Sequence, residues 1–536
     1  MKFERDQLFL TEEHKQQGYW IQDDLHLPYP LTPLFASFQT NAMREGTARA
    51  FETIKSPMKQ FYTKIERGYL YQMVKPYDGP MEQRMKEHQE AVAERFGRNH
   101  ELLEHYVLTE LLPVYARLDA FRQTDFTREQ AIEQCQQLYL FYLRAWEIHF
   151  EIVMPGGALL SKLEALYCEL SGADDGAVIY EWLVGMMNKT LETDRAMWKL
   201  ADQVKGSAEL TRLFDETDPA ELIDRLAEVA QGPAFLASLA TFLDDYGYQA
   251  THPHEFVAKT WIEDPTPVLT IVAQYAQKEY DFDAEFAKLV EKRENAFEAV
   301  VATFPDGEKK QRFLQLYEWA LASCSVDEDH HFYIDAMLPA KSRLFFIAVG
   351  QKLVEAGALR EANDICFLYL DEVIDLLAEP IAIEDRIVER KQDWEANRLY
   401  KPIPSYGTAP TRSNKAAERM SGGKQAEVEG NQFKGYAASQ GTYTGQVKVI
   451  HDPSEFSAVE QGDVLVCRTT TPTWTALFSI VGAVVTDAGG ILCHAATVAR
   501  EYQLPAVVGS KVGTSLLQDG QTVTVDGAKG LVIIHE

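Results

Sequence analysis

The chain has 536 residues, of which 46% are hydrophobic and 25% are charged. These percentages are typical of globular proteins, and the length suffices for more than one domain. A net charge of −29 argues against nucleic acid or an anionic membrane surface as the main partner. The six cysteines lack C-x-x-C spacing, so they indicate neither a zinc site nor a disulfide framework. The sequence has no signal-peptide core and no bilayer-length apolar run, and we expect a cytoplasmic protein.

The first 60 residues mix loop and helix patterns. Residues 20–34 contain Pro28, Pro30 and Pro33, and three prolines in six residues exclude a helix there. We therefore predict an extended segment, which either lines a cleft or straps across a helical body.

Residues 80–395 show mainly helical periodicity. In residues 128–154 the apolar side chains recur at helical spacing, and Pro155 followed by two glycines predicts the end of that helix. Further helices are predicted over residues 158–170, 176–204, 218–230, 233–245, 265–278, 282–303, 308–325, 339–356 and 370–394. No fixed-length repeat is present, so the sequence predicts one irregular helical domain over residues 1–400.

Two segments in this region are unusually polar and are predicted to be loops. Residues 246–255 contain His254 and Glu255, and residues 327–335 contain His330 and His331 among acidic side chains. Histidine and carboxylate together can bind a metal. Because no H-E-x-x-H spacing occurs, we assign no metal ligand, and solvated loops or helix caps are the alternative.

The composition changes after residue 400. Residues 401–432 are polar, rich in proline and glycine, and without periodicity, which predicts a flexible linker with a span of roughly 30 Å. Residues 433–536 have an α/β pattern. Strands are predicted over 446–450, 463–467, 483–486, 506–508, 522–525 and 531–534, with helices near 454–459, 473–480 and 494–503. The predicted fold is a large, mainly α-helical N-terminal domain followed by a small C-terminal α/β domain.

A glycine-rich turn joins a predicted strand to a predicted helix in this last domain. Gly489 and Gly490 allow the backbone to approach a ligand closely, and His494 stands at the start of the helix. Helix starts present unpaired N–H groups that suit phosphate. A neutral imidazole at this point could carry a phosphoryl group as a nucleophile. The alternative is a histidine that only packs or caps.

Residues 435–536 resemble the phosphohistidine swivelling domain of phosphoenolpyruvate (PEP) synthase, pyruvate phosphate dikinase and rifampicin phosphotransferase. The resemblance is carried by residues 462–466, 471–474, 489–496, 499–501 and 504–509. It implies that His494 is the phosphohistidine and that the surrounding loop binds the phosphoryl group. The implied loop residues are Gly489, Gly490, Cys493 and Arg500. Arg500 either steadies the phosphoryl group or pairs with Glu501 or Asp487, whereas Cys493 is interpreted as structural packing.

The helical part more loosely resembles the acceptor-binding domain of rifampicin phosphotransferase and of the phenylphosphate synthase large subunit. The matching pieces lie in residues 20–34, 246–265 and 343–372. Full-length relatives have an ATP-grasp domain before these modules, and no such sequence is present here. The resemblance therefore implies that a separate ATP-grasp subunit binds ATP and Mg²⁺.

The resemblance implies a phosphotransferase with two half-reactions. His494 would take a phosphoryl group from ATP, with dikinase-type chemistry, and pass it to an organic hydroxyl such as a phenol. For the second step the general base is either His254 with Glu255, or His330 or His331 with Asp329 or Asp335, and Arg343 would balance charge. Two alternatives are a component of an antibiotic-phosphorylating enzyme and a non-catalytic phosphocarrier or regulatory protein.

Overall fold

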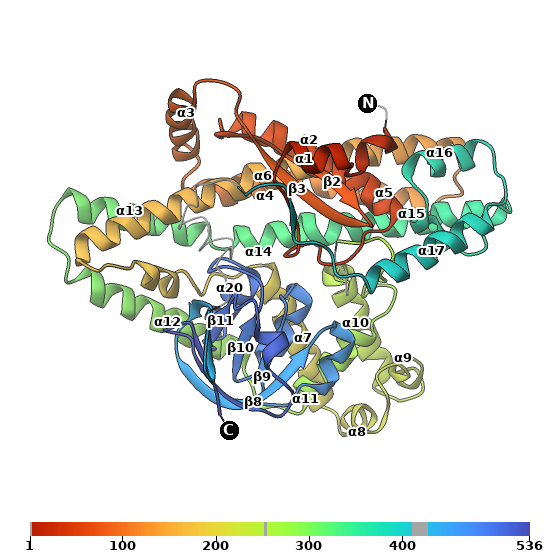
Figure 1. The fold of residues 1–536 in the computed structure, drawn as a ribbon. Coiled ribbons are helices and arrows are strands. Elements are labelled where there is room, and N and C mark those ends of the chain that lie inside the picture. The colour runs from red at the N-terminus through yellow and green to blue at the C-terminus, as the bar shows by residue number, and fades with distance from the viewer. Residues whose placement is uncertain (1–2, 251–253, 410–426, 536) are drawn as a thin grey trace. The chain divides into compact units, whose positions relative to one another are not determined.

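The computed structural model describes residues 3–250, 254–409 and 427–535 (Figure 1). These residues fall into two compact units. Unit 1 comprises Met1–Ser161, His252–Ala258 and His330–Thr411. Unit 2 comprises Lys162–Thr251, Lys259–Asp329 and Arg412–Glu536. No helix of the described part of the chain is both long and apolar enough to cross a membrane.

Unit 1 is mainly helical. Its α-helices are α1 (Glu12–Gln17), α2 (Pro33–Thr53), α3 (Met81–Ala93), α4 (Asn99–Tyr106), α5 (Leu112–Arg122), the first part of α6 (Arg128–Ser171), α15 (Met337–Glu355), α16 (Leu370–Ala378) and α17 (Glu384–Arg398). Four shorter helical segments are η1 (Arg5–Leu8), η2 (Val107–Leu111), η4 (His331–Ala336) and η5 (Ala362–Phe367). Of these, η2 and η4 are π-helices, whose hydrogen bonds run from i to i+5.

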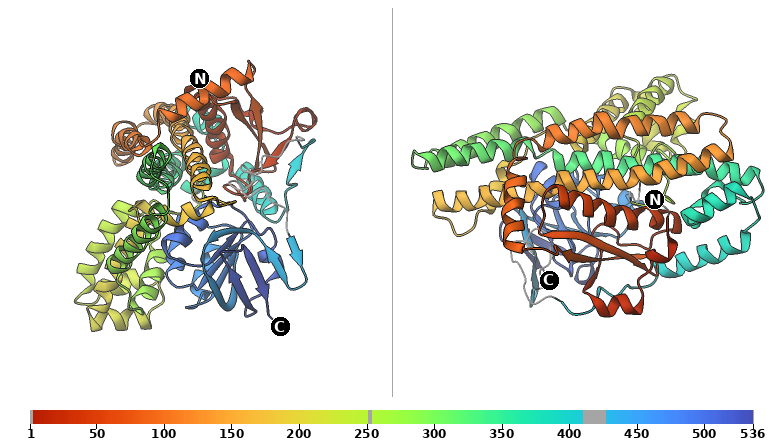
Figure 2. Two further views of the ribbon diagram at one scale, coloured as in Figure 1. Left: turned by 90° about the vertical axis from the view of Figure 1, so that its left-hand side faces the viewer. Right: turned by 90° about the horizontal axis from the view of Figure 1, so that it is seen from above.

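A four-stranded antiparallel sheet completes unit 1, in the order β2-β3-β1-β4. Its strands are β1 (Trp20–Gln22), β2 (Met58–Glu66), β3 (Tyr69–Pro76) and β4 (Ser405–Tyr406). The sequence did not predict the β2–β3 hairpin. Arg67 and Gly68 form its turn with φ of 50° and 82°, as a type I′ turn requires. Helix α2 lies against this hairpin (Figure 2).

The prediction that the helix of residues 128–154 ends before Pro155 is wrong, because α6 continues through Pro155 to Ser171. Proline removes one backbone hydrogen bond within a helix. Apolar side chains on both sides of it, including Ile148, Ile152 and Leu159, are buried in the core. Asn99 also donates a hydrogen bond of 3.0 Å to the Ile152 carbonyl. Packing therefore outweighs the local propensity of the proline.

Unit 2 combines helices with a sheet. Its helices are the end of α6, η3 (Ala177–Trp182), α7 (Lys189–Lys205), α8 (Ala208–Glu216), α9 (Leu222–Leu226), α10 (Gly232–Tyr246), α11 (Thr266–Ala276), α12 (Phe282–Val301), α13 (Glu308–Ala322), α14 (Val326–His330), η6 (Pro453–Ala458), η7 (Pro472–Trp474), α19 (Thr475–Phe478), α20 (His494–Glu501) and α21 (Gly513–Leu516). The loop predicted over residues 327–335 is wrong, because α14 and η4 make this segment helical. Its many acidic side chains are typical of a loop, but the side chains of Val326, Phe332 and Ile334 are buried.

The sheet of unit 2 has nine strands in the order β5-β6-β13-β12-β8-β9-β10-β11-β7. The strands are β5 (Glu427–Glu429), β6 (Gln432–Lys434), β7 (Tyr436–Ser439), β8 (Thr442–Ile450), β9 (Val464–Cys467), β10 (Ala483–Thr486), β11 (Ala506–Val508), β12 (Thr522–Asp526) and β13 (Leu531–Ile534). Strands β8 to β11 are parallel. Leu465 and Val484 point to one face, with α20, whereas Val464 and Val485 point to the other. Two buried faces explain why these strands are continuous apolar runs.

The C-terminal strand predictions are confirmed, because all six predicted strands form with bounds that differ by at most four residues. Residues 410–426 of the predicted linker lie outside the described residues. On either side of them, β4 pairs with β1 and β5 pairs with β6. The division into units groups the helices of residues 162–251 and 259–329 with the C-terminal sheet rather than with the rest of the predicted domain 1–400.

We predict that Gly46→Ala destabilises unit 1. At Gly46 of α2 an added Cβ would lie 2.8 Å from the backbone of Trp146 and Glu147 in α6. Backbone cannot yield as a side chain can, so we expect a loss of about 1–3 kcal/mol in the free energy of unfolding. Urea unfolding followed by circular dichroism measures it. Gly156→Ala is the control, because Gly156 is also helical and has no atom within 4 Å of an added Cβ. We expect this variant to gain about 0.5–1 kcal/mol, and equal behaviour of the two would contradict the prediction.

Candidate functional site

The turn between β10 and α20 places His494 at the first position of the helix. Cys493 is the N-cap residue, with extended backbone. Gly489 has a φ of 105°, and a Cβ there would lie 2.7 Å from the Cys493 sulfur. Only glycine fits this conformation at low cost. The imidazole therefore stands where the first N–H groups of the helix lack intrahelical partners.

Both ring nitrogens of His494 face polar atoms of unit 2. Nδ1 lies 3.1 Å and 3.2 Å from the two carboxylate oxygens of Glu328. Nε2 lies 3.3 Å from the Thr475 hydroxyl. An ionised carboxylate only accepts hydrogen bonds, so the pairing assigns the proton to Nδ1 and the lone pair to Nε2. Nε2 can then accept a hydrogen bond from the Thr475 hydroxyl.

Glu328 is a buried side chain that the sequence prediction missed. It lies in α14, and the Thr190 hydroxyl in the first turn of α7 donates a hydrogen bond of 2.5 Å to it. The next residue, Asp329, accepts a hydrogen bond of 2.8 Å from the Lys189 backbone N–H. The positive, N-terminal end of the α7 dipole thus stabilises the negative charge of these two neighbouring carboxylates. Burial nevertheless raises the pKa of Asp329 to about 6.

Arg500 is hydrogen-bonded to the backbone of the glycine-rich turn and of a neighbouring strand. Its guanidinium is buried and donates hydrogen bonds of 2.8 Å and 3.0 Å to the carbonyls of Ala438 and Ile491. Neither Asp487 nor Glu501 is among its hydrogen-bond partners in the described residues. Asp487 instead accepts from Thr514, and Glu501 accepts from the Gly185 N–H. These contacts favour a structural role in holding the glycine-rich turn.

Cys493 and Gly490 complete the predicted phosphoryl loop. Gly490 accepts a hydrogen bond of 3.1 Å from the Cys493 N–H, which closes the turn before the helix. Burial raises the pKa of the Cys493 thiol above its ordinary value. The thiol is thus held neutral beside Gly489, as packing requires.

The C-terminal end of α20 is attached to the helices of unit 2 through a buried carboxylate. Asp194 of α7 accepts hydrogen bonds from the hydroxyls of Tyr275 and Tyr502. Tyr502 follows α20 directly, and Asp194 is fully buried. Burial raises the pKa of Asp194 to about 6, although the tyrosine hydroxyls oppose this shift.

The predicted acceptor-site residues all lie in unit 1. Glu255 accepts hydrogen bonds from the Thr32 N–H at 2.7 Å and from the Thr32 hydroxyl at 2.6 Å. Thr32 is the N-cap residue of α2, so Glu255 fixes the end of the extended segment that follows β1. Burial raises the pKa of Glu255 to about 7. The prediction of a non-helical segment over residues 20–34 holds up to residue 32, with β1 at residues 20–22 and neither helix nor strand at 23–32, but α2 already begins at Pro33.

Arg343 holds the residues that follow Glu255. Its guanidinium donates to the carbonyls of Phe256 and Val257 and, at 2.8 Å, to the Asn363 side chain. Arg343 therefore shapes the backbone next to His254 and Glu255. The residue before them in the predicted loop, Pro253, lies outside the described residues.

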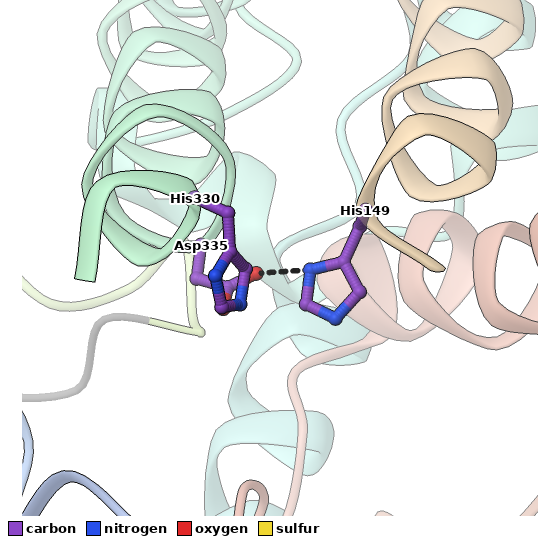
Figure 3. Close-up of side chains that lie close together, drawn as sticks. All are labelled: His149, His330 and Asp335. Atoms are coloured by element: carbon purple, nitrogen blue, oxygen red, sulfur yellow. Dashed lines mark ion pairs between the residues drawn. The ribbon is translucent and has the colours of Figure 1, made fainter. Parts of the chain in front are cut away.

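A buried carboxylate of η4 gathers three histidines (Figure 3 shows two of them). Asp335 lies 3.2 Å from His149 Nδ1, 3.8 Å from His330 Nε2 and 2.5 Å from His331 Nδ1. Burial acts to raise the pKa of Asp335, but His149 and His331 outweigh it and hold the pKa well below its usual value. Of the two predicted carboxylate partners, Asp335 and not Asp329 is the one that these histidines contact.

Further charges of unit 1 act on this cluster. Burial lowers the pKa of His254 to about 4, with Asp335 opposing the shift and His26 and His331 adding to it. Asp23 accepts a hydrogen bond of 2.9 Å from His26 and raises its pKa. His254 is therefore a neutral imidazole at pH 7, able to accept a hydrogen bond.

One group of the described residues offers at least three His, Cys, Asp or Glu ligand atoms at metal-binding separation. It consists of His149, His330 and Asp335, whose ligand atoms all lie within 4.8 Å of one another. The sequence prediction named no metal ligand and missed His149, which lies on α6 far away in the chain. Only the aromatic spacing around His149 was visible, and it indicated a core position.

Two segments match described protein families. Residues 149–328 match the rifampicin phosphotransferase fourth domain, and residues 459–530 match the PEP-utilising enzyme mobile domain. The uncharacterized phosphotransferase YvkC of Bacillus subtilis is 36% identical over 537 residues, which cover 99% of this chain and 63% of that protein. These matches and this relative support a protein of the PEP-utilising, swivelling-domain family.

Other relatives match parts of the chain. Rifampicin phosphotransferase of Streptomyces sviceus is 26% identical over 72% of this chain and 44% of its own length. A probable phosphoenolpyruvate synthase of Archaeoglobus fulgidus is 52% identical over 30% of this chain and 22% of its own length. The chain thus spans less than two thirds of each of these three relatives. Residues 433–536, which include the matched mobile domain, are called the swivelling domain below.

We predict that the attachment of the swivelling domain through Asp194 is pH-dependent. The native pKa of about 6 lies above the model value of 3.8, so the native state binds more protons than the unfolded state between these values. The stability contribution is fullest below pH 4 and is lost as the pH rises through 6, by roughly 3 kcal/mol. Asp194→Asn should therefore gain thermal stability over the wild type at pH 7.5 and not at pH 4.5.

Melting temperatures across this pH range measure the effect. Asp202→Asn is the control, because Asp202 lies on the same helix and its side chain is 61% exposed. A difference between Asp194→Asn and wild type that is constant with pH would contradict the prediction.

Proposed function

We propose that this chain is a phosphotransferase component in which His494 carries a phosphoryl group from ATP to an organic hydroxyl. One observation carries the proposal. His494 Nδ1 faces the buried Glu328 carboxylate, which leaves the lone pair on Nε2 at the start of α20. The pairing also holds the imidazole in one tautomer, which a histidine that only packed or capped would not require. The matches to the mobile domain and to phosphotransferases support the same conclusion.

In the first half-reaction Nε2 attacks a phosphorus atom of ATP. A P–N bond forms, and the bond to the leaving phosphate oxygen breaks with its electron pair on that oxygen. We propose dikinase-type chemistry on an ATP-grasp subunit, where Mg²⁺ would neutralise the phosphate charge. Gly489, Gly490 and the N–H groups of the α20 start suit the bound phosphoryl oxygens.

In the second half-reaction the acceptor oxygen forms a bond to phosphorus and its proton passes to a base, for which His254, His330 and His331 are the candidates. The P–N bond breaks and its electron pair returns to Nε2. Glu328 keeps the proton on Nδ1, so the leaving group is a neutral imidazole rather than an imidazolide. We propose that the acceptor hydroxyl binds in unit 1 beside His254 and Asp335, where Glu255 and Arg343 fix the backbone. A phenol is the acceptor class we favour. The match to the rifampicin phosphotransferase fourth domain supports an antibiotic hydroxyl as the second candidate.

The central experiment measures phosphorylation of the full chain. The chain is mixed with ATP, Mg²⁺ and the candidate ATP-grasp subunit, and intact mass spectrometry follows an acid-labile gain of one phosphoryl group. We expect His494→Ala to abolish the gain. His451→Ala is the control, because His451 is an exposed histidine of the swivelling domain, and it should be phosphorylated like the wild type.

Phosphorylation that persists in His494→Ala would overturn the proposal. The loaded protein is then offered phenols, alcohols and a rifamycin, and phosphate esters are measured. Discharge to one of these classes identifies the acceptor. If no hydroxyl compound discharges the protein, the chain is a phosphocarrier instead.

We predict that Glu328→Gln separates the two half-reactions. Loading with phosphoramidate, a chemical donor to histidine, requires no protein partner and should still go to completion, because the glutamine carbonyl can accept the hydrogen bond from Nδ1. Discharge to phenol should be about 10- to 100-fold slower, because a charge-assisted hydrogen bond to the leaving imidazole is worth about 1.5–3 kcal/mol.

Rates of loss of the phosphoryl group, followed by mass, test this prediction. Glu318→Gln on α13 is the control, because Glu318 is an exposed glutamate of unit 2. Equal discharge rates for Glu328→Gln and the control would show that the carboxylate does not assist the leaving group.

A further inference from the structure

We propose that His149, His330 and Asp335 form a binding site for one divalent transition-metal ion in unit 1. The three side chains supply two imidazole nitrogens and one carboxylate oxygen (Figure 3). This donor set is typical of zinc, iron(II), cobalt(II) and manganese(II) sites. Mg²⁺ and Ca²⁺ prefer oxygen ligands alone, so the site differs in chemistry from the Mg²⁺ of the ATP step.

A π-helical turn of the backbone brings two of the three ligands together. His330 is the last residue of α14, and Asp335 follows five residues later in the π-helix η4. In an α-helix two residues five apart point about 140° away from each other. The i to i+5 hydrogen bonding of a π-helix returns them to nearly the same face. His149 reaches the pair from α6.

Two buried polar atoms of the cluster face each other without hydrogen-bond geometry. His149 Nδ1 and Asp335 Oδ1 lie 3.2 Å apart as an ion pair, and neither atom makes a hydrogen bond of good geometry with another described residue. Two buried polar atoms without hydrogen bonds are costly. A cation between them would satisfy both, since each can offer a lone pair.

The separations fit a metal ion after small side-chain shifts. With bonds of 2.0–2.1 Å, tetrahedral ligand atoms lie roughly 3.3 Å apart. His149 Nδ1 lies 3.2 Å from Asp335 Oδ1, His330 Nε2 lies 3.8 Å from the other carboxylate oxygen, and one ligand atom from each of the three residues lies within 4.8 Å of the others. Movement of about 1.5 Å in one imidazole therefore closes the site, within the range of a rotamer adjustment.

The surroundings orient the ligands. His331 contacts the second carboxylate oxygen of Asp335 at 2.5 Å, the position that an orienting partner takes in metal sites. The ring of His149 packs against Trp146 and Phe150, with centroids 4.7 Å and 4.8 Å away. The Tyr115 hydroxyl donates to the Tyr333 carbonyl and fixes η4 between the ligands.

Three protein ligands leave a coordination position open for an oxygen donor. An acceptor hydroxyl bound there would lose its proton more readily, because a metal ion lowers the pKa of a bound O–H group. This last step alone rests on the proposed function, whereas metal binding does not.

Cobalt(II) is the probe, because its visible absorption reports coordination. The full chain is treated with EDTA, freed of it, and titrated with Co²⁺ and then with Zn²⁺ by calorimetry. We expect one equivalent to bind with micromolar or tighter affinity, with absorption bands that Zn²⁺ removes. His149→Ala, His330→Ala and Asp335→Asn should each weaken binding by at least ~100-fold, and His331→Ala by about 10- to 100-fold.

Two controls keep the test independent of stability and of phosphoryl transfer. His105→Ala removes an exposed histidine of unit 1, and His494→Ala removes the phosphorylated residue, and both should bind Co²⁺ like the wild type. Each variant is also compared with its own metal-free form by melting temperature, so that a destabilised variant is recognised by the absence of a Zn²⁺-induced shift. Binding that is absent in the wild type, or unchanged in the three ligand variants, overturns the proposal.

Discussion

The hydrogen bond between His494 and the buried Glu328 carboxylate is the interaction on which the proposed chemistry depends. It decides which imidazole nitrogen carries the proton, and hence which one carries the lone pair. The surrounding contacts serve this geometry. Thr190 holds Glu328, Gly489 admits the tight turn, and Arg500 ties that turn to the sheet. Without the carboxylate, the same helix start would be an ordinary anion site with an ambiguous imidazole.

One short helical segment serves two sites. α14 gives Glu328 to the site of His494 in unit 2, and its last residue, His330, belongs to the histidine cluster of unit 1. The two residues are two positions apart in the chain. The sequence predicted a polar loop over this segment, because its acidic side chains and histidines outnumber its apolar residues. The structure nevertheless buries the apolar side chains of Val326, Phe332 and Ile334.

The parts of the fold that sequence could predict are those in which local pattern and packing agree. The apolar runs of β9, β10 and β11 are buried on both faces, so pattern alone placed them. Pro155 is the opposite case, since its local signal was overruled by buried neighbours from distant segments. The histidine at the start of α20 was predictable from its turn. Glu328 and His149 were not, because each acquires its role from a contact with a residue more than 160 positions away.

The π-helix η4 also bears on how such a chain can diverge. A π-helical turn holds one residue more than the α-helical turn it replaces. Loss of one codon between His331 and Asp335 would turn the segment into α-helix without rotating α15, because the π-helical turn is what accommodates the additional residue. His330 and Asp335 would then stand four residues apart, a spacing that places both side chains on one face of an α-helix. Relatives with and without the additional residue should thus both present this histidine and aspartate on the same side of the helix.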